Sequence, residues 1–191
     1  MEPLAFPIST DRLVVRFYEQ RDRELELAIH GDDRLFSDVP MNPRTPAEID
    51  ESLEKRVGQH ALGEGGAIVS LAVEVATDKS YVGVVQLTPI RTDPLQVAIG
   101  WLALKTQQGH GYVSEAVAAV IDLLFSGTEV HRIVAYITVG NDSSVRLAER
   151  LGFRKEAHFV QSLYLRDEWR DESVYALLRE DRESVGNPTQ R

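Results

Sequence analysis

The sequence predicts a single mixed α/β domain, with a central, mostly antiparallel, twisted sheet of about six to seven strands flanked by about four helices. Three observations lead to this prediction. The chain has 191 residues, which corresponds to one compact domain. Its content of 43% hydrophobic and 27% charged residues is that of a globular protein. Along the chain, β-rich runs and helical patterns follow the order strand, two helices, three strands, helix, strand, helix, two strands.

The N-terminal part begins with one strand and a short helix. Leu13–Phe17 is rich in β-branched and aromatic residues and is predicted as a strand. Asp22 can cap a short helix that runs through Leu25–Ile29. The prolines and aspartates of Gly31–Pro43 predict a loop.

A second helix is predicted to begin at Thr45. Thr45 can cap the helix, Pro46 suits its first turn, and Glu48 can reach back to the cap amide. Its buried face is expected to contain Ile49, Leu53 and Val57. Its end is expected at Gly63, Gly65 and Gly66.

Three antiparallel strands are predicted next. Ala67–Ala76 and Tyr81–Ile90 are β-rich runs joined by a hairpin at Thr77–Ser80. The third run, Leu95–Leu104, follows a turn at Arg91–Pro94.

The C-terminal half alternates helices and strands. The predicted elements are a helix over Ser114–Phe125, a strand over Ile133–Val139, a helix over Ser143–Leu151 that Gly152 stops, and strands over Phe153–Leu165 and Ser173–Leu178 separated by Arg166–Glu172. The domain is expected to span residues 1–180, and the charged tail, 181–191, is expected to be disordered.

Composition excludes several classes of function. The chain contains no cysteine, so disulfides, thiolate nucleophiles and sulfur-ligated zinc are excluded, and a reducing cytoplasm is the expected location. The net charge of −9 disfavours nucleic acid as a partner. That charge either attracts a cationic substrate or only keeps the protein soluble. The apolar stretches are too short to span a bilayer and the N-terminus does not resemble a signal peptide, so no membrane role is expected.

The segment most informative about function is Gln108–Val113, a loop between a predicted strand and a predicted helix. Gly109 and Gly111 let backbone N–H groups turn inward, and the helix start adds partial positive charge. Together these features form a cradle suited to a diphosphate; the alternative is a plain strand-to-helix turn. No G-x-x-x-x-G-K-[ST] motif occurs, and Ser114 stands where G-x-G-x-x-G requires its third glycine.

Five segments in order, over roughly residues 10–178, resemble the GNAT acetyltransferase superfamily and its RimJ/RimL-like branch. The loop is similar to Q/R-x-x-G-x-G/A at Gln108 and Gly111, with Val113 in place of the last small residue. The other matches are Thr10–Arg16 to T-x-R-L-x-L-R, Ile99–Trp101 to I-G-Y/W, Asn141–Ser144 with Leu151–Phe153 to N-x-x-S…L-G-F, and Trp169–Asp171 with Tyr175 to W/Y-R-D…Y.

The resemblance implies a GNAT fold, acetyl-CoA as cosubstrate and no metal. It also implies that the strand ending at Trp101–Leu104 diverges from the strand that begins near Ile133, leaving backbone groups open to pantetheine. The cosubstrate-binding residues that it implies are Trp101, Leu102, Ala103, Leu104, Gln108, Gly109, His110, Gly111, Tyr112, Val113, Asn141 and Ser144.

Three of these residues are implied to act in the transfer. The Leu102 amide would polarise the thioester carbonyl, the Asn141 side chain would bind the pantetheine arm, and the Ser144 hydroxyl would give a proton to the leaving sulfur. The alternative for Asn141 and Ser143 is that they only cap a helix. His110 is expected to contribute only its amide.

No general base is assigned. Ala98 stands where relatives carry glutamate just before the I-G-Y/W segment. Glu74 is a possible substitute, although an acidic residue on a half-exposed strand is more often simply solvated. A chain of water molecules can take the proton instead.

The remaining candidates are expected to be structural. His30, Asp32 and Asp33 come nearest to a metal site, but they are expected to form an exposed turn. Trp169 and Tyr175 are expected to pack in the core or against a pocket.

Two functions remain open. The first is an N-acetyltransferase that acts on a primary amine, either a protein N-terminus or a small polyamine-like or aminoglycoside-like compound. Its acceptor pocket is expected at the Gly31–Thr45 loop and the Arg166–Glu172 turn. The second is a non-catalytic acyl-CoA-binding regulatory module on the same fold, which Val113 and Ala98 keep open. A monomer and a homodimer are both compatible with the sequence.

Overall fold

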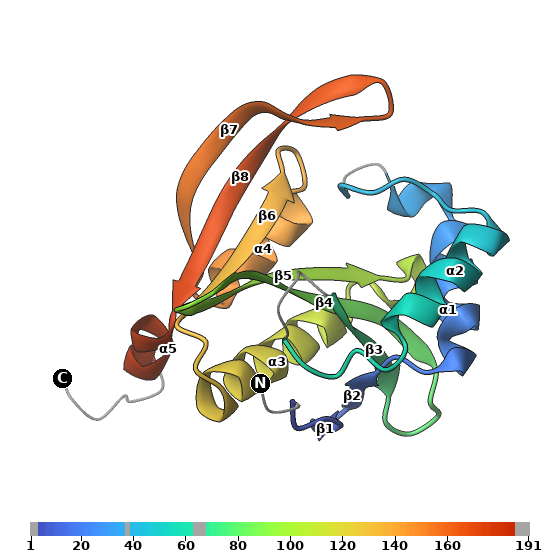
Figure 1. Ribbon diagram of the computed structural model, residues 1–191, viewed down its shortest axis with the longest axis horizontal. Helices are drawn as coiled ribbons and strands as arrows, with labels where there is room; N and C mark the ends of the chain where they lie inside the picture. Colours follow the sequence, from blue (N-terminus) through green and yellow to red (C-terminus); the bar gives the residue numbers. More distant parts are fainter. Residues whose placement is uncertain (1–3, 37–38, 63–67, 186–191) are drawn as a thin grey trace.

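The computed structural model describes residues 4–36, 39–62 and 68–185, and in these ranges eight strands form one sheet (Figure 1). The strand order is β1-β2-β3-β4-β5-β6-β8-β7. Neighbouring strands are antiparallel except β5 and β6, which are parallel. The strands are β1 Ile8–Ser9, β2 Leu13–Phe17, β3 Val69–Val75, β4 Tyr81–Thr92, β5 Leu95–Ala103, β6 Arg132–Thr138, β7 Arg154–Leu165 and β8 Glu168–Leu178.

Helices cover both faces of the sheet. The α-helices in the described ranges are α1 Arg23–His30, α2 Pro46–Arg56, α3 Tyr112–Gly127, α4 Asp142–Arg150 and α5 Arg179–Val185. Helix α3 buries Val117 and Ile121 in the main core on one face, whereas α1 and α2 bury Leu25 and Leu53 in a second cluster. Val84 belongs to the second cluster and Val85 to the main core, because successive residues of a strand point to opposite faces.

The predicted fold class is confirmed, and most predicted elements exist. The helix start at Thr45 is a capping box, in which the Glu48 N–H donates to Thr45 Oγ1 (3.4 Å) and the Thr45 N–H donates to Glu48 Oε2 (2.8 Å). Gly152 has the predicted left-handed conformation, with φ 92°. The sheet has one strand more than expected, because β1 is a two-residue strand paired with β2.

Three predicted boundaries are wrong. Helix α2 ends at Arg56, since Val57 is extended and Gly58 has φ 88°; the glycines at 63, 65 and 66 lie outside the described residues. Strand β8 begins at Glu168 rather than at Ser173, so β7 and β8 form a tight hairpin. In the predicted tail, residues 181–185 belong to α5 instead of being disordered, while 186–191 lie outside the described ranges.

Strands β5 and β6 part at the centre of the sheet. They are paired only where Gln96–Ala98 lies beside Arg132–Val134. Beyond this point β5 pairs only with β4, as far as Ala103, and β6 pairs only with β8, as far as Thr138 (Figure 1). This confirms the divergence implied by the family resemblance.

None of the described helices is both long and apolar enough to cross a membrane.

Candidate active site

Two cavities meet where β5 and β6 part. The loop cavity, of about 480 Å³, is lined by the Gln108–Val113 loop, the end of β5 and the start of α4. The helix cavity, of about 560 Å³, is lined by α1, α2, the loop before α2, β5 and β6. Both are of the size of small-molecule sites. The two linings share Val39, Trp101, Leu102, Asn141 and Ser144.

The glycine loop presents backbone donors at the start of α3. Gly109 and Gly111 have φ values of 83° and 77°, which residues other than glycine rarely adopt. Gly111 is the N-cap of α3, so no side chain caps the helix. The first helical bond runs from the Glu115 N–H to the Gly111 carbonyl (3.1 Å), which leaves the preceding amides available to an anion.

Positive side chains surround the same cavity. Lys105, Arg146 and Arg150 line it, and its described lining contains no carboxylate. Arg146 and Arg150 are four residues apart on α4, so they lie on the same side of that helix. Sequence reasoning missed these three residues. The four-residue spacing of Arg146 and Arg150, just after the Asn141–Ser144 segment, is the sequence signal that predicts a shared face for these two.

The loop is tied to the N-terminal strand by a charged clamp that sequence reasoning also missed. Glu115, in the first turn of α3, accepts from the Thr10 hydroxyl, from the Arg12 N–H (3.2 Å) and from Arg12 Nε (2.7 Å). Arg12 also donates to the His110 carbonyl (3.0 Å) and lies over the Tyr112 ring. Within the Thr10–Arg16 segment, Thr10 and Arg12 therefore join the N-terminal strand to the glycine loop and to the first turn of α3.

Most of the predicted cosubstrate-binding residues line one or both cavities. The two exceptions are Leu104, whose amide donates to the Val82 carbonyl (3.0 Å), and His110, whose ring stacks on Tyr112. Val113 packs against the main core and still lines the loop cavity. Gln108 donates from Nε2 to the Ala103 carbonyl (3.3 Å), which faces the opening beside β5.

The strand register contradicts the role predicted for the Leu102 amide. Leu102 pairs with Val84 in the ladder between β4 and β5. Two residues further on, the Leu104 N–H donates to the Val82 carbonyl, so Leu104 and Val82 form a hydrogen-bonded pair. Hydrogen-bonded and non-bonded pairs alternate along an antiparallel ladder, so the Leu102 N–H points to β4. The N–H of Trp101 points instead to the side where β6 has diverged.

Asn141 and Ser144 lie at the junction of the two cavities. Asn141 Oδ1 accepts from the Ser144 N–H (3.1 Å) and from the Ser143 hydroxyl (2.9 Å), so Asn141 caps α4. Asn141 nevertheless lines both cavities. Ser144 also lines both cavities, and its hydroxyl is not hydrogen-bonded to any other described residue.

Among the described residues that line the helix cavity, Glu26 is the one with a carboxylate, and both of its oxygens have polar partners. Oε1 accepts from the Tyr18 hydroxyl (2.8 Å) and from Arg56 Nη1 (3.1 Å), while Oε2 lies 2.7 Å from Arg56 Nη2 in an ion pair and 3.6 Å from His30 Nε2. Burial opposes ionisation, but the polar contacts with His30, Arg56 and Tyr18 outweigh it and lower the pKa of Glu26 to about 2. Glu26 is therefore an ionised partner for Arg56 and a poor base.

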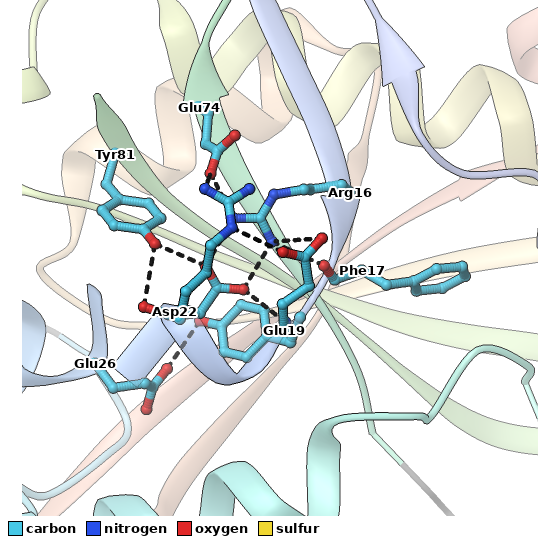
Figure 2. Close-up of polar contacts among 9 residues, drawn as sticks. Arg16, Phe17, Glu19, Asp22, Glu26, Glu74 and Tyr81 are labelled. Atoms are coloured by element: carbon cyan, nitrogen blue, oxygen red, sulfur yellow. Dashed lines mark hydrogen bonds and ion pairs between the residues drawn. The ribbon is translucent and has the colours of Figure 1, made fainter. Parts of the chain in front are cut away.

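Glu74 is not the half-exposed, solvated residue that the sequence predicts. It is 2% exposed, pairs with Arg16, and lies 3.0 Å from Arg21 Nη1. Arg16 also binds both oxygens of the fully buried Asp22, at 2.8 and 2.7 Å. Figure 2 shows Glu74, Arg16, Asp22 and Tyr81 in one network. Glu74 lines neither cavity and serves as a structural ion pair.

The same network explains why Asp22 does not cap α1 through its side chain. Asp22 stands at the N-cap position, but its carboxylate accepts from Arg16, from the Glu19 N–H (2.8 Å) and from the Tyr81 hydroxyl (3.0 Å). Burial and the bond to Asp22 raise the pKa of Tyr81 to about 12.

The remaining predicted residues have structural positions. Tyr175 is buried in the main core as expected, but Trp169 is 59% exposed and packs against Tyr164 outside both cavities. No cluster of three potential metal ligands occurs in the described ranges. His30 is buried rather than in an exposed turn, and its Nδ1 accepts from the Arg44 N–H (3.1 Å).

The predicted acceptor-pocket segments differ in outcome. The loop before α2 contributes Val39, Pro40, Met41 and Arg44 to the helix cavity, whereas 166–172 contributes nothing to its described lining.

Comparison with known proteins points to a single family. Residues 12–154 match the acetyltransferase (GNAT) domain family. The chain is 29% identical over 184 residues to a probable N-acetyltransferase, YjcK, of Bacillus subtilis, covering 90% of this chain and 96% of the relative. It is 26% identical to the [ribosomal protein uS5]-alanine N-acetyltransferase of Escherichia coli, covering 91% of each chain. A GNAT-family acetyltransferase structure from Bacillus anthracis superposes with a TM-score of 0.81 at 26% identity, covering 92% of this chain and 99% of that one.

Proposed function

The chain belongs to the GNAT acetyltransferase superfamily, in its RimJ/RimL-like branch, and we propose that it transfers the acetyl group of acetyl-CoA to a primary amine by direct attack in a ternary complex. It is an N-acetyltransferase. The observation that carries the proposal is the meeting of two cavities at the parted strands, because one cavity can hold the donor while the other admits the acceptor.

The loop cavity fits acetyl-CoA. The uncapped start of α3 and the left-handed glycines suit the diphosphate, since backbone amides and a helix N-terminus attract anions. Lys105, Arg146 and Arg150 would meet the remaining phosphate charge. The pantetheine arm would then reach the opening beside Trp101, with the thioester near Asn141 and Ser144.

The transfer needs one bond to form and one to break. The amine nitrogen attacks the thioester carbonyl, a tetrahedral oxyanion develops, and the carbon–sulfur bond breaks to give the amide and CoA. We assign oxyanion stabilisation to the Trp101 N–H in place of Leu102, because only the former faces the opening. Ser144 would protonate the leaving sulfur. Water takes the proton that the amine loses, since Glu26 and Glu74 are both held in ion pairs.

The acceptor is a primary amine, on a protein N-terminus or on a small molecule. The Escherichia coli relative is named for an alanine of ribosomal protein uS5, which supports an N-terminal amine as one candidate. Cytoplasmic location and oligomeric state remain predictions from the sequence.

The test is release of free thiol from acetyl-CoA with a panel of amines, followed with a thiol-reactive dye. The chain has no cysteine, so the enzyme itself gives no signal. We expect amine-dependent thiol release together with acetylated product. CoA binding without thiol release from any amine would favour the non-catalytic acyl-CoA-binding module instead.

A further inference from the structure

The helix cavity has a positive lining in a protein that is strongly negative as a whole. Arg44, Lys55 and Arg56 line it, against Glu26 as the carboxylate among its described lining residues. The chain has a formal net charge of −9. The positive charge is therefore a local property of this cavity, and it acts at short range on whatever binds there.

Glu26 cannot offer a free negative charge to a cationic ligand. Arg56 lies 2.7 Å from one of its oxygens and donates to the other at 3.1 Å, and Tyr18 adds a further bond. Arg56 is itself buried, with its guanidinium over the Tyr18 ring. An ammonium group placed beside this closed pair would meet Arg44 and Arg56, and like charges repel.

Arg44 supplies the surplus charge. Its Nη1 lies 3.9 Å from Glu26, whose charge Arg56 already balances. Two contacts fix its position. The backbone N–H of Arg44 donates to the buried His30 Nδ1 (3.1 Å), and its side-chain Nη1 donates to Ser52 Oγ (3.3 Å). Its side chain is 37% exposed, so the guanidinium is held at the cavity and still open to a ligand.

Lys55 lines the same cavity but is engaged elsewhere. Its Nζ lies 2.6 Å from Glu51 on the same helix, and its side chain is 71% exposed. This residue is a matched cationic control for Arg44.

We propose that the acceptor amine carries a carboxylate, which Arg44 binds, and an apolar body that packs against residues such as Ile29, Val84 and Leu102. Arginine suits this role because its planar guanidinium binds carboxylates through two parallel hydrogen bonds. Polyamines, which carry only positive charge, are poor acceptors. This inference rests on the proposed acetyl transfer and specifies its acceptor.

The experiment compares acceptors that differ by one carboxylate, at saturating acetyl-CoA. One pair is a free apolar amino acid and its carboxamide, a second pair is a tripeptide with Asp or Asn at its second position, and spermidine represents polyamines. We expect kcat/KM to favour the carboxylate member of at least one pair by about ten- to a hundredfold, the range for a charge-assisted hydrogen bond. The pair that responds tells whether the carboxylate belongs to a free amino acid or to a peptide.

Two variants connect the preference to Arg44. Arg44→Gln should reduce kcat/KM for the carboxylate member to the level of its uncharged partner, mainly by raising KM, whereas Lys55→Gln should keep the preference. Equal kcat/KM within both pairs, or spermidine as the preferred acceptor, would overturn the inference while leaving the acetyl transfer intact. Absence of thiol release with every amine would instead contradict the proposed function itself.

Discussion

Ser144 is the residue to which the proposed mechanism assigns the proton for the leaving sulfur. Its backbone N–H is used in the cap with Asn141, while the residue itself lines both cavities. Ser143 is adjacent in sequence, but its hydroxyl donates to Asn141 and it lines only the loop cavity. A comparison of the two serines therefore tests the role proposed for Ser144 against a purely structural one.

Ser144→Ala should lower kcat by about a hundredfold or more at saturating acetyl-CoA, because a general acid contributes on this order. Alanine keeps the N–H that Asn141 accepts, so the fold should be unaffected. Steady-state thiol release measures the effect, with Ser143→Ala as the control. Equal losses in the two variants, or no loss in Ser144→Ala, would remove Ser144 from the mechanism.

Glu26 predicts a pH dependence of stability. Its pKa falls from 4.5 to about 2 on folding, so its ion pair stabilises the protein fully above pH 4.5 and loses this effect as the pH falls toward 2. Glu26→Gln should be less stable than the parent protein at pH 7, because it leaves Arg56 buried without its charge partner. Its stability should then fall by about 1–2 kcal/mol less than that of the parent between pH 7 and pH 3.

Urea unfolding at the two pH values measures this difference. Parallel losses of stability in the parent protein and in Glu26→Gln would show that Glu26 titrates normally.

At the scale of elements, the glycine loop depends on a strand distant in sequence. Arg12 joins β2 to the first turn of α3 through Glu115 and to the loop through the His110 carbonyl. The ion pair is partly exposed, with side-chain exposures of 48% and 21%, so its contribution to overall stability is small. Its main effect should be on the position of the loop.

Arg12→Ala should therefore raise the Kd for CoA by about three- to tenfold, with little change in melting temperature. Arg23→Ala is the matched control, because Arg23 forms an exposed pair with Asp50 away from the loop. Calorimetric titration with CoA gives both constants. An unchanged Kd in Arg12→Ala would show that the clamp does not position the loop.

The elements that could be predicted are those with a strong local signal. The three central strands have β-rich runs bounded by turns, and α2 has a complete capping box. Helix α5 was missed because its charged sequence lacks an apolar face; tertiary contacts hold it, including bonds from Arg179 to the carbonyls of Thr128 and Val130 at 2.6 Å. Strand β1 is too short for its period to be recognised.

The parts of the candidate site that could be predicted also have a strong local signal in the sequence. Gly109 and Gly111 are recognisable because a left-handed turn before a helix favours glycine. The choice between the amides of Leu102 and Trp101 was not, because it depends on the phase of the β4–β5 ladder, and a shift of one residue reverses it. Lys105 and Arg150 come together only through folding, since one precedes α3 and the other ends α4.

For the whole molecule, the parting of β5 and β6 brings these parts into one site. It opens the centre of an otherwise continuous sheet, so that the cavity beside α3 and α4 meets the cavity beneath α1 and α2. The net charge of the molecule and the local charge of the helix cavity also predict different acceptors. The net charge of −9 favours a cationic acceptor, whereas the side chains that line the helix cavity favour an anionic one.

The central claim is that the turn around Gly109 and Gly111 binds the diphosphate of CoA. Calorimetric titration tests it with CoA and with pantetheine, which has the same thiol arm without the nucleotide, on the parent protein, Gly111→Ala and Gly127→Ala. Gly111 has φ 77°, where alanine is strained, and Gly127 ends α3 far along the helix.

We predict that the parent protein binds CoA at least about a hundredfold more tightly than pantetheine, since phosphate contacts are charge-assisted. Gly111→Ala should weaken CoA binding by about tenfold, and Gly127→Ala should not. No detectable heat with millimolar CoA, or equal affinity of Gly111→Ala and the parent protein for CoA, would contradict the claim.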